Sequence, residues 1–247
     1  MALKIKEINK HNNDTCLVTF TSEGYTELTK NLLQSINKND INYNLNIFCI
    51  DKNSFKYEFG YNQNKILFDD KPIDVLRDGK MLVQKHDNFA DVMLKKFEII
   101  YESLKKFQHV IYVDGDIVIT KDFLDYVNRF KDDCDILFQN DKRPSKPNLT
   151  NLCAGFMIIK SNTKTKTFFD PKNGSYDEFK DYDTHDQTYI NKNKDNFDYS
   201  ILPLNKFPNG PHYYKYNSKL NPFIVHFNYL LGKEKIDAIK KYGFWYY

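Results

Sequence analysis

Short apolar runs and a helical spacing of apolar residues alternate at the start of the chain. Residues 15–21 and 45–50 are apolar runs of strand length. Between them, apolar residues recur at the spacing of an amphipathic helix, behind Ser22 as its N-cap. These apolar residues are Tyr25, Leu28, Leu32, Leu33 and Ile36. A strand, a helix and a strand in this order predict a parallel sheet that is covered by helices.

The same patterns predict further elements along the chain. A helix is expected from about residue 88 to residue 106, and Lys96 interrupts its apolar face. It leads into an apolar strand at residues 109–113. Other strands are expected at residues 65–68, 117–120, 135–139, 156–160 and 223–227, and other helices at 122–130 and 233–242. The rest of 51–85 and the segment 203–221 are expected to be loops.

Composition and charge exclude several classes of protein. The chain has 247 residues, of which 41% are hydrophobic, so it can form a packed core as one domain. Its 36 basic and 33 acidic residues nearly cancel, which argues against nucleic acid as a partner. Four scattered cysteines without a C-x-x-C pair indicate buried thiols. We find neither a signal peptide nor an apolar run long enough for a membrane span, and we expect a cytoplasmic protein.

Two carboxylates follow the predicted strand at residues 109–113. Asp114 and Asp116 would project from the carboxyl end of that strand, where open α/β sheets bind ligands, and Gly115 lets the backbone turn sharply. Like charges so close together are unfavourable unless a cation bridges them, and carboxylate oxygens suit Mg²⁺ or Mn²⁺. The pattern therefore predicts a divalent metal site, although an exposed turn would have the same sequence.

Five segments, in order along the chain, resemble GT-A-type glycosyltransferases. They are residues 18–25, 111–120, 153–160, 186–191, and 226–228 together with 232–235. The likeness is to the nucleotide-diphospho-sugar transferases, especially retaining ones with glycogenin-like motifs. It implies one α/β domain over residues 1–247, with a GT-A-like (Rossmann-like) fold and a central, mostly parallel sheet flanked by helices. The absence of an anchor implies a cytoplasmic or virus-type setting.

The resemblance also implies an activity and its partners. The protein would be a hexosyl- or pentosyltransferase that moves a sugar from a UDP sugar to an unknown glycan, protein or small-molecule acceptor. Asp114 and Asp116 would bind a divalent cation on the donor diphosphate, and His226 would add an imidazole. A nitrogen ligand beside two carboxylates favours Mn²⁺ over Mg²⁺. Without the resemblance, a hydrogen-bonded structural histidine would be the favoured interpretation of His226.

Three lysines are candidates for binding the diphosphate. Lys235 follows Gly232 at a helix start, from which its ammonium could reach the diphosphate. Lys233 would replace it if the register shifts, and either lysine could instead be part of a solvated helix end. Lys96 needs an anion if it is buried in its apolar face, or it extends its stem to reach solvent.

Other residues are expected to meet the nucleoside and the donor sugar. The nucleoside would contact four residues after the first strand, Phe20, Thr21, Ser22 and Tyr25. Asp51 either binds a ribose hydroxyl or is a turn aspartate. Ala154 and Gly155 would touch the sugar, but the asparagine that precedes this pair in the family is Cys153 here. A thiol replaces an amide poorly, although Asn151 is near enough in sequence to compensate.

Asp186 is the candidate for the reactive centre, with Gln187 beside it. A carboxylate at a helix start can face the anomeric carbon and stabilise an oxocarbenium-like transition state. The alternative is that Asp186 only caps a helix and Gln187 merely follows.

Two other functions remain open. Residues 114–118 also resemble the D-x-D-x-[TV] motif of haloacid-dehalogenase-type phosphatases, although that motif normally opens the chain. A non-catalytic nucleotide-sugar-binding protein is the other alternative, which Cys153 favours and Asp186 opposes.

Overall fold

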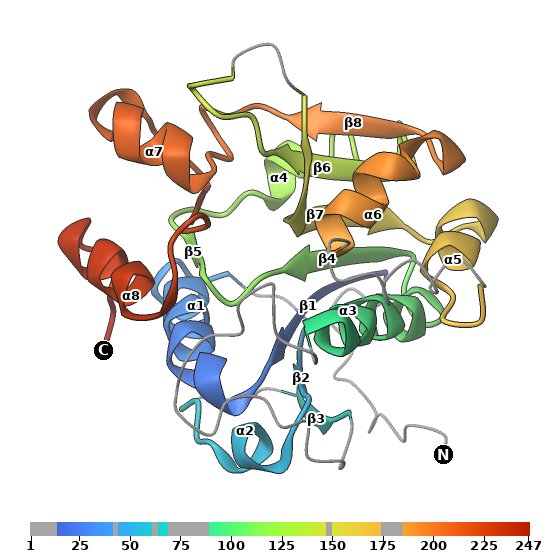
Figure 1. The fold of residues 1–247 in the computed structure, drawn as a ribbon, viewed down its shortest axis with the longest axis horizontal. Helices are drawn as coiled ribbons and strands as arrows, with labels where there is room; N and C mark the ends of the chain where they lie inside the picture. Colours follow the sequence, from blue (N-terminus) through green and yellow to red (C-terminus); the bar gives the residue numbers. More distant parts are fainter. Residues whose placement is uncertain (1–13, 42–43, 61–63, 69–88, 147–149, 174–184) are drawn as a thin grey trace.

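Parallel strand pairs dominate the central sheet of this protein (Figure 1). The computed structural model describes residues 14–41, 44–60, 64–68, 89–146, 150–173 and 185–247. Within these ranges, seven strands form the sheet in the order β3-β2-β1-β4-β7-β6-β8. They are β1 (Thr15–Thr21), β2 (Leu45–Cys49), β3 (Asn64–Leu67), β4 (His109–Val113), β6 (Ile136–Asn140), β7 (Leu152–Lys160) and β8 (Tyr199–Leu202). Only the pairs that β7 makes with β4 and β6 are antiparallel, so the mostly parallel α/β sheet predicted from the sequence is confirmed.

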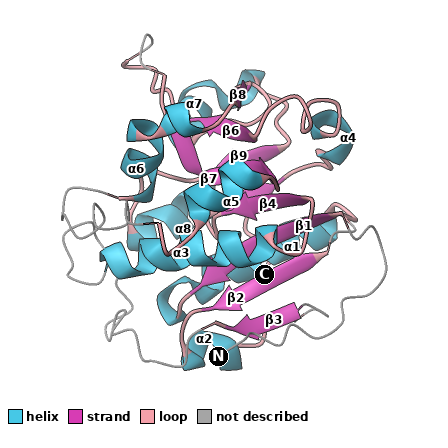
Figure 2. Ribbon diagram, turned by 90° about the vertical axis from the view of Figure 1, so that its right-hand side faces the viewer, coloured by secondary structure: helices cyan, strands magenta, loops and turns pink. Residues whose placement is uncertain are grey.

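Helices cover both faces of the sheet. Alternate residues of a strand point to opposite faces. On β1, Val18 belongs to the same buried cluster as Phe97, whereas Leu17 belongs to a second cluster with Leu32. The longer helices are α1 (Thr26–Lys38), α3 (Phe89–Leu104), α5 (Thr163–Phe169), α6 (Asp186–Lys192), α7 (Gly210–Tyr216) and α8 (Gly232–Lys241). Figure 2 shows the strands stacked between these helices, from β3 to β8.

Several predicted elements begin or end at other residues. The expected helix at 122–130 is only α4 (Leu124–Val127), and the strand expected at 156–160 is the second half of β7. Ser22 precedes a short 3-10 helix, Glu23–Tyr25, rather than α1 itself. Residues 61–63 and 69–85 of the expected loop lie outside the described residues. The helix α5 and the strand β8 were not predicted.

Two expected loops contain helices, so those predictions were wrong. The segment 203–221 includes α7, because the Asn209 side chain accepts a hydrogen bond from the backbone N–H of His212 and Pro211 stands in the first turn. Proline is well suited to that position, since the first N–H groups of a helix have no partner within it. The segment after β2 includes α2 (Lys52–Lys56), which Asp51 caps by accepting from the backbone N–H of Ser54.

A small second sheet completes the arrangement that positions the site. Strand β5 (Ile117–Ile119) pairs antiparallel with β9 (Ile224–His226), with Ile117 opposite His226. This pairing brings the end of β9 beside the turn that follows β4. Among the described helices, none is both long enough and apolar enough to cross a membrane. The four cysteines are free thiols, and Cys134 is the one that is only partly buried.

Candidate active site

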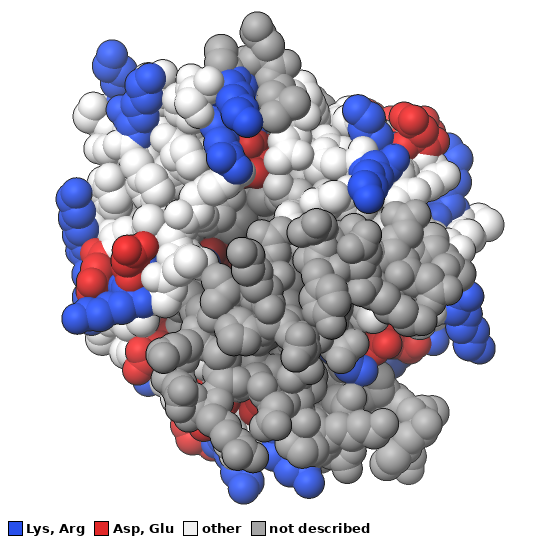
Figure 3. All heavy atoms as spheres, viewed as in Figure 1, with Lys and Arg blue, Asp and Glu red and all other residues white. Residues whose placement is uncertain are grey.

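A cavity of about 920 Å³ opens at the carboxyl ends of β1 and β4. Its lining comes from β1, α3, the turn after β4, β7, α6 and the segment between β9 and α8. This is the edge at which open α/β sheets bind ligands. On the face shown in Figure 3, the described Lys and Arg side chains are spread around the margin rather than gathered into one basic patch.

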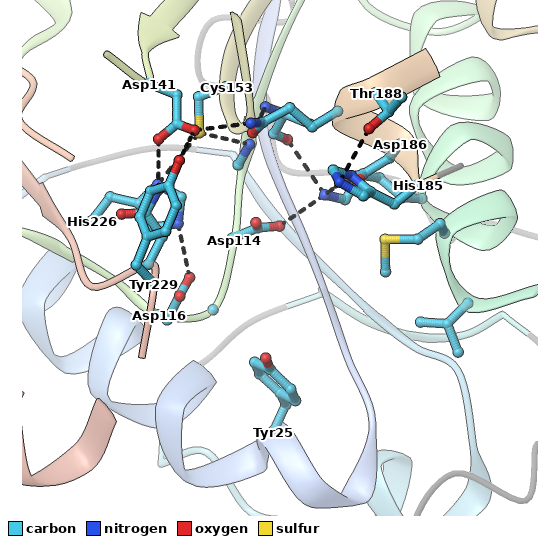
Figure 4. Close-up of a pocket in the computed structure, with 18 of the residues that line it drawn as sticks. Tyr25, Asp114, Asp116, Asp141, Cys153, His185, Asp186, Thr188, His226 and Tyr229 are labelled. Atoms are coloured by element: carbon cyan, nitrogen blue, oxygen red, sulfur yellow. Dashed lines mark hydrogen bonds and ion pairs between the residues drawn. The ribbon is translucent and has the colours of Figure 1, made fainter. Parts of the chain in front are cut away.

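Asp114, Asp116 and His226 converge in this cavity (Figure 4). One ligand atom from each lies within 4.8 Å of the others, and the Asp116 Oδ1 to His226 Nε2 distance is 3.3 Å. The two carboxylates come from the turn between β4 and β5, and the pairing of β5 with β9 places the histidine beside them. The structure thus brings together the three residues predicted as metal ligands.

The surroundings of these three residues fit a cation. A Cβ on Gly155 would lie 2.4 Å from His226 Cε1 and 2.7 Å from Asp114 Oδ2, so only glycine leaves room for both side chains. His226 Nδ1 donates to Gln139 Oε1 at 2.7 Å. The Gln139 amide is itself fixed, because its nitrogen donates to the carbonyls of Phe207 and Pro208. With Nδ1 engaged in this way, Nε2 is the ring nitrogen directed at Asp116 and available to a metal.

Lys96 is buried in the cavity wall and does not reach solvent. Its side chain is 3% exposed, with Nζ 2.5 Å from Asp186 Oδ2 and 3.2 Å from Asp114 Oδ1. Burial alone would lower the pKa of Lys96, but the two carboxylates raise it above its usual value. Burial alone would raise the pKa of Asp186, but Lys96 and His185 hold it below its usual value. One ammonium therefore links Asp114 to Asp186, and it favours the ionised form of Asp186.

Lys235 forms a similar buried ion pair with Asp116. Its Nζ lies 2.6 Å from Asp116 Oδ2 and 5.8 Å from the centre of the Tyr25 ring. Burial opposes the charge on Asp116, but Lys235 and His226 hold its pKa well below the usual value. Gly232, with φ +49°, begins the helix that carries this lysine. Neither Gly232 nor Lys233 is among the residues that line the cavity.

The residues expected to bind the nucleoside divide into two groups. Four of them line the cavity, namely Phe20, Thr21, Ser22 and Tyr25. Asp51 does not, because its carboxylate accepts from the backbone N–H groups of Glu23 at 2.9 Å and Ser54 at 2.7 Å. It supports the turn behind the cavity wall, which is the turn-aspartate alternative of the sequence.

The residues predicted to touch the donor sugar come from β7 and the start of α6. Ala154, Gly155, Asp186 and Gln187 all line the cavity. Gly115 also lines it, and a Cβ there would meet Thr29 Oγ1 at 2.8 Å.

Cys153 is only 1% exposed and packs 3.6 Å from His226 Nδ1. Asn151 also lines the cavity, and its amide nitrogen donates to Asp141 Oδ2 at 3.1 Å.

The sequence analysis missed three residues that support the site. Tyr112 donates from its hydroxyl to Asp114 Oδ1 at 2.6 Å, and Gln139 orients His226. Asp141 lines the cavity directly after β6. The rule that located Asp114, a carboxylate just beyond an apolar strand, would also have found Asp141. Nothing in the local pattern distinguishes Gln139 from an ordinary strand residue.

Comparison with known proteins agrees with this architecture. A curated relative, the UDP-galactose:fucoside alpha-3-galactosyltransferase of Dictyostelium discoideum, is 24% identical over 303 aligned residues. The alignment covers 100% of this chain and 45% of the relative, so the chain spans less than half of that protein's length.

Two solved structures show a similar fold. The galactosyltransferase LgtC, in complex with donor and acceptor sugar analogs, aligns with a TM-score of 0.52 and 10% identity over 85% of this chain and 86% of LgtC. A glycosyltransferase involved in the glycosylation of the major capsid of PBCV-1 aligns with a TM-score of 0.56 and 10% identity, over 92% of this chain and 99% of that one.

The family itself follows from the sequence match. A family model described as nucleotide-diphospho-sugar transferase matches residues 41–238, which is most of the chain and includes Lys96, Asp114, Asp116, Asp186 and His226. The chain belongs to the nucleotide-diphospho-sugar transferase family.

Proposed function

We propose that the protein transfers a sugar from a UDP sugar to an acceptor, with a divalent cation and with retention of anomeric configuration. The observation that carries the proposal is the cluster of Asp114, Asp116 and His226 in a cavity at the carboxyl edge of the sheet. The name of the Dictyostelium relative supports UDP-galactose as the first donor to test. Retention rests on the family likeness.

Each residue has a defined part in such a transfer. Mn²⁺ or Mg²⁺ held by Asp114, Asp116 and His226 would neutralise charge on the departing diphosphate. Lys235, placed beside Asp116, would bind an oxygen of the same diphosphate. Asp186 is held ionised by Lys96, so its negative charge can stabilise positive charge that develops at the anomeric carbon.

The first experiment tests the donor and the metal together. UDP-galactose with Mn²⁺ should raise the melting temperature by several degrees, since a ligand at a hundred times its dissociation constant adds about 2.7 kcal/mol. Excess chelator should remove the shift, and Asp114→Asn and Asp116→Asn should abolish it. The control is Asp132→Asn, an exposed carboxylate that lies outside the cavity. An equal shift in chelator would contradict metal-dependent binding.

The second experiment distinguishes a transferase from the two alternatives. NMR of UDP-galactose with Mn²⁺ follows the release of UDP and the anomer of the sugar first formed. UDP with an unchanged anomer supports a retaining transferase acting on water. Tight binding without turnover would favour a nucleotide-sugar-binding protein. Release of phosphate from simple phosphoesters would favour a phosphatase, which the family match does not.

A further inference from the structure

Asp141 is a buried carboxylate whose contacts none of the roles above explains. It follows β6, lines the cavity and is 2% exposed. Five side chains from four parts of the chain donate hydrogen bonds to it. They are Asn151 (3.1 Å), Gln187 (2.9 Å), Asn209 (3.2 Å), Asn228 (3.0 Å) and the hydroxyl of Tyr229. Figure 4 shows Asp141 beside Tyr229, with Asp186 on the other side of Asp114.

This set of donors leaves Asp141 no capacity for a substrate. An ionised carboxylate has about four lone-pair sites. Five donors already share them, and the residue is almost fully buried. A sugar hydroxyl could bind to Asp141 only by displacing one of these partners. The structure therefore favours an indirect role, through the residues that Asp141 holds.

The charge of Asp141 fixes how the neighbouring amides are turned. Because a carboxylate only accepts, each amide must present its NH₂ group to it and its oxygen elsewhere. The Asn209 oxygen accepts from the backbone N–H of His212 at 3.0 Å, and so begins α7. The Asn228 oxygen accepts from the backbone N–H of Gly210 at 2.8 Å. The Gln187 oxygen is left on the side of the Ala154 backbone N–H, at 3.4 Å.

The backbone conformation of Tyr229 also indicates that Asp141 fixes its surroundings. It is a non-glycine residue with φ +64°, a conformation that bulky side chains rarely adopt. Its hydroxyl donates to Asp141, and the Arg143 guanidinium lies 4.3 Å from the centre of its ring. Burial and the bond to Asp141 raise the pKa of Tyr229, which keeps the phenol protonated and able to donate. The backbone just beyond the metal-site His226 is thus held by the same carboxylate.

We propose that Asp141 is a positioning residue that acts through Gln187: it holds the Gln187 amide in one orientation beside the donor sugar without touching the donor itself. This inference rests on the proposed function, in which Gln187 lies next to Asp186 at the reacting sugar. If the Gln187 amide were reversed, its NH₂ group would point where its carbonyl oxygen now lies. Asp141 would therefore affect the rate of sugar release and leave donor binding almost unchanged.

The test is a double-mutant cycle between Asp141→Asn and Gln187→Ala. Asp141→Asn keeps the shape of the side chain but brings an NH₂ group among five donors. With UDP-galactose and Mn²⁺, this variant should release sugar at least about tenfold more slowly, with the dissociation constant of UDP within about twofold. When Gln187 is already alanine, the same change should alter the rate by less than about twofold. Equal effects in both backgrounds would overturn the proposal.

Asp135→Asn is the matched control. Asp135 is also a buried carboxylate that accepts from an amide side chain, Asn162, but it lies outside the cavity. It should show the loss of stability that removal of a buried charge causes, with sugar release unchanged. If Asp135→Asn slowed release as much as Asp141→Asn does, loss of stability alone would account for the effect and the proposal would fail.

A measurement on the parent protein covers the case in which Asp141→Asn does not fold. The side-chain NH₂ signals of Gln187 can be identified in a ¹⁵N spectrum by their disappearance in Gln187→Ala. Bonded to a buried carboxylate, they should exchange with solvent at least about tenfold more slowly than free glutamine. Exchange as fast as in free glutamine would overturn the proposal. This readout needs no turnover, so failure of the proposed activity remains distinguishable from failure of this inference.

Discussion

Two sides of the cavity hold their carboxylates in opposite ways. On one side, which we call the ion-pair cluster, Lys96 binds Asp114 and Asp186, and Lys235 binds Asp116. On the other side, which we call the amide network, the donors to Asp141 from the described residues are all neutral: Asn151, Gln187, Asn209, Asn228 and Tyr229. Asp116, Asp186 and Asp141 are all buried, and Asp114 is partly exposed, so the main difference between the two sides lies in the partners of the carboxylates.

The difference suggests two tasks. In the ion-pair cluster, charges of both signs meet in one place, and a cation with a diphosphate can enter by exchanging one charged partner for another. In the amide network, one negative charge is already saturated, and nothing is gained by exchanging its partners. We therefore expect changes in the first region to affect binding and chemistry, and changes in the second to affect shape and orientation.

Lys96→Met should have the largest effect, because it leaves the buried Asp186 and the partly exposed Asp114 without their shared cation. Loss of one partner of a buried ion pair costs about 3 to 5 kcal/mol, and sugar release should fall together with stability. The control is the neighbouring Lys95→Met, since Lys95 is partly exposed and pairs with Glu98 at 3.1 Å. That change should cost about 0.5 kcal/mol or less. Urea unfolding measures both, and equal losses in the two variants would break the contrast.

Gly155→Ala tests whether the ion-pair cluster needs its empty space. The added Cβ would press on His226 Cε1 and Asp114 Oδ2, so the metal response should disappear while the fold survives a loss of about 1 to 3 kcal/mol. Gly60→Ala is the control, because Gly60 has φ +83° and no heavy atom of the described residues lies within 4 Å of the added Cβ. It should lose about 1 to 2 kcal/mol from backbone strain alone and keep its full response to Mn²⁺. Retention of that response in Gly155→Ala would mean that the cation binds elsewhere.

Gln139→Leu tests whether the neutral amide of Gln139 contributes to metal binding in the ion-pair cluster. Without the acceptor for Nδ1–H, the His226 ring loses its fixed orientation toward Asp116. Removal of such a supporting hydrogen bond typically weakens metal binding by about 10- to 100-fold. Titration with Mn²⁺, followed by electron paramagnetic resonance, measures the affinity. An unchanged affinity would show that packing around His226 is enough to orient it.

The sequence predicted the ion-pair side much better than the amide network, and the reason is physical. Asp114 and Asp116 follow an apolar strand directly, and a strand end is a local feature. The partners of Lys96 are not local, since Asp186 lies 90 residues away along the chain. Asp141 depends on donors from residues 151 to 229, whose convergence only the folded sheet creates.

The segment before α7 shows a second limit. Its proline- and asparagine-rich composition indicates a loop, yet the same residue types start a helix when Asn209 caps it and Pro211 stands in its first turn. Composition alone cannot distinguish a loop from the start of a helix here. The Asn209 cap also depends on a distant residue, because the orientation of its amide is set by Asp141.

Asp135→Asn should have the smallest effect on stability among the changes to buried charges. It serves as a reference for Asp141, because Asp135 is a buried carboxylate outside the cavity. Burial alone would raise the pKa of Asp135, but hydrogen bonds from the Asp198 backbone N–H, Asn162 and Lys164 hold it below the usual value. A lowered pKa in the folded state means that the stabilisation is present above the unfolded pKa of about 3.9 and is lost as the pH falls through the folded value. At pH 7, Asp135→Asn should cost about 1.5 kcal/mol, the contribution of a hydrogen bond to a charged group. Urea unfolding of both proteins at pH 7 and pH 3 should show this difference shrinking at the lower pH. A difference that stayed constant would mean that the shape of the Asp135 side chain, and not its charge, holds these partners, and the charge argument for the amide network would then have to be tested at Asp141 itself.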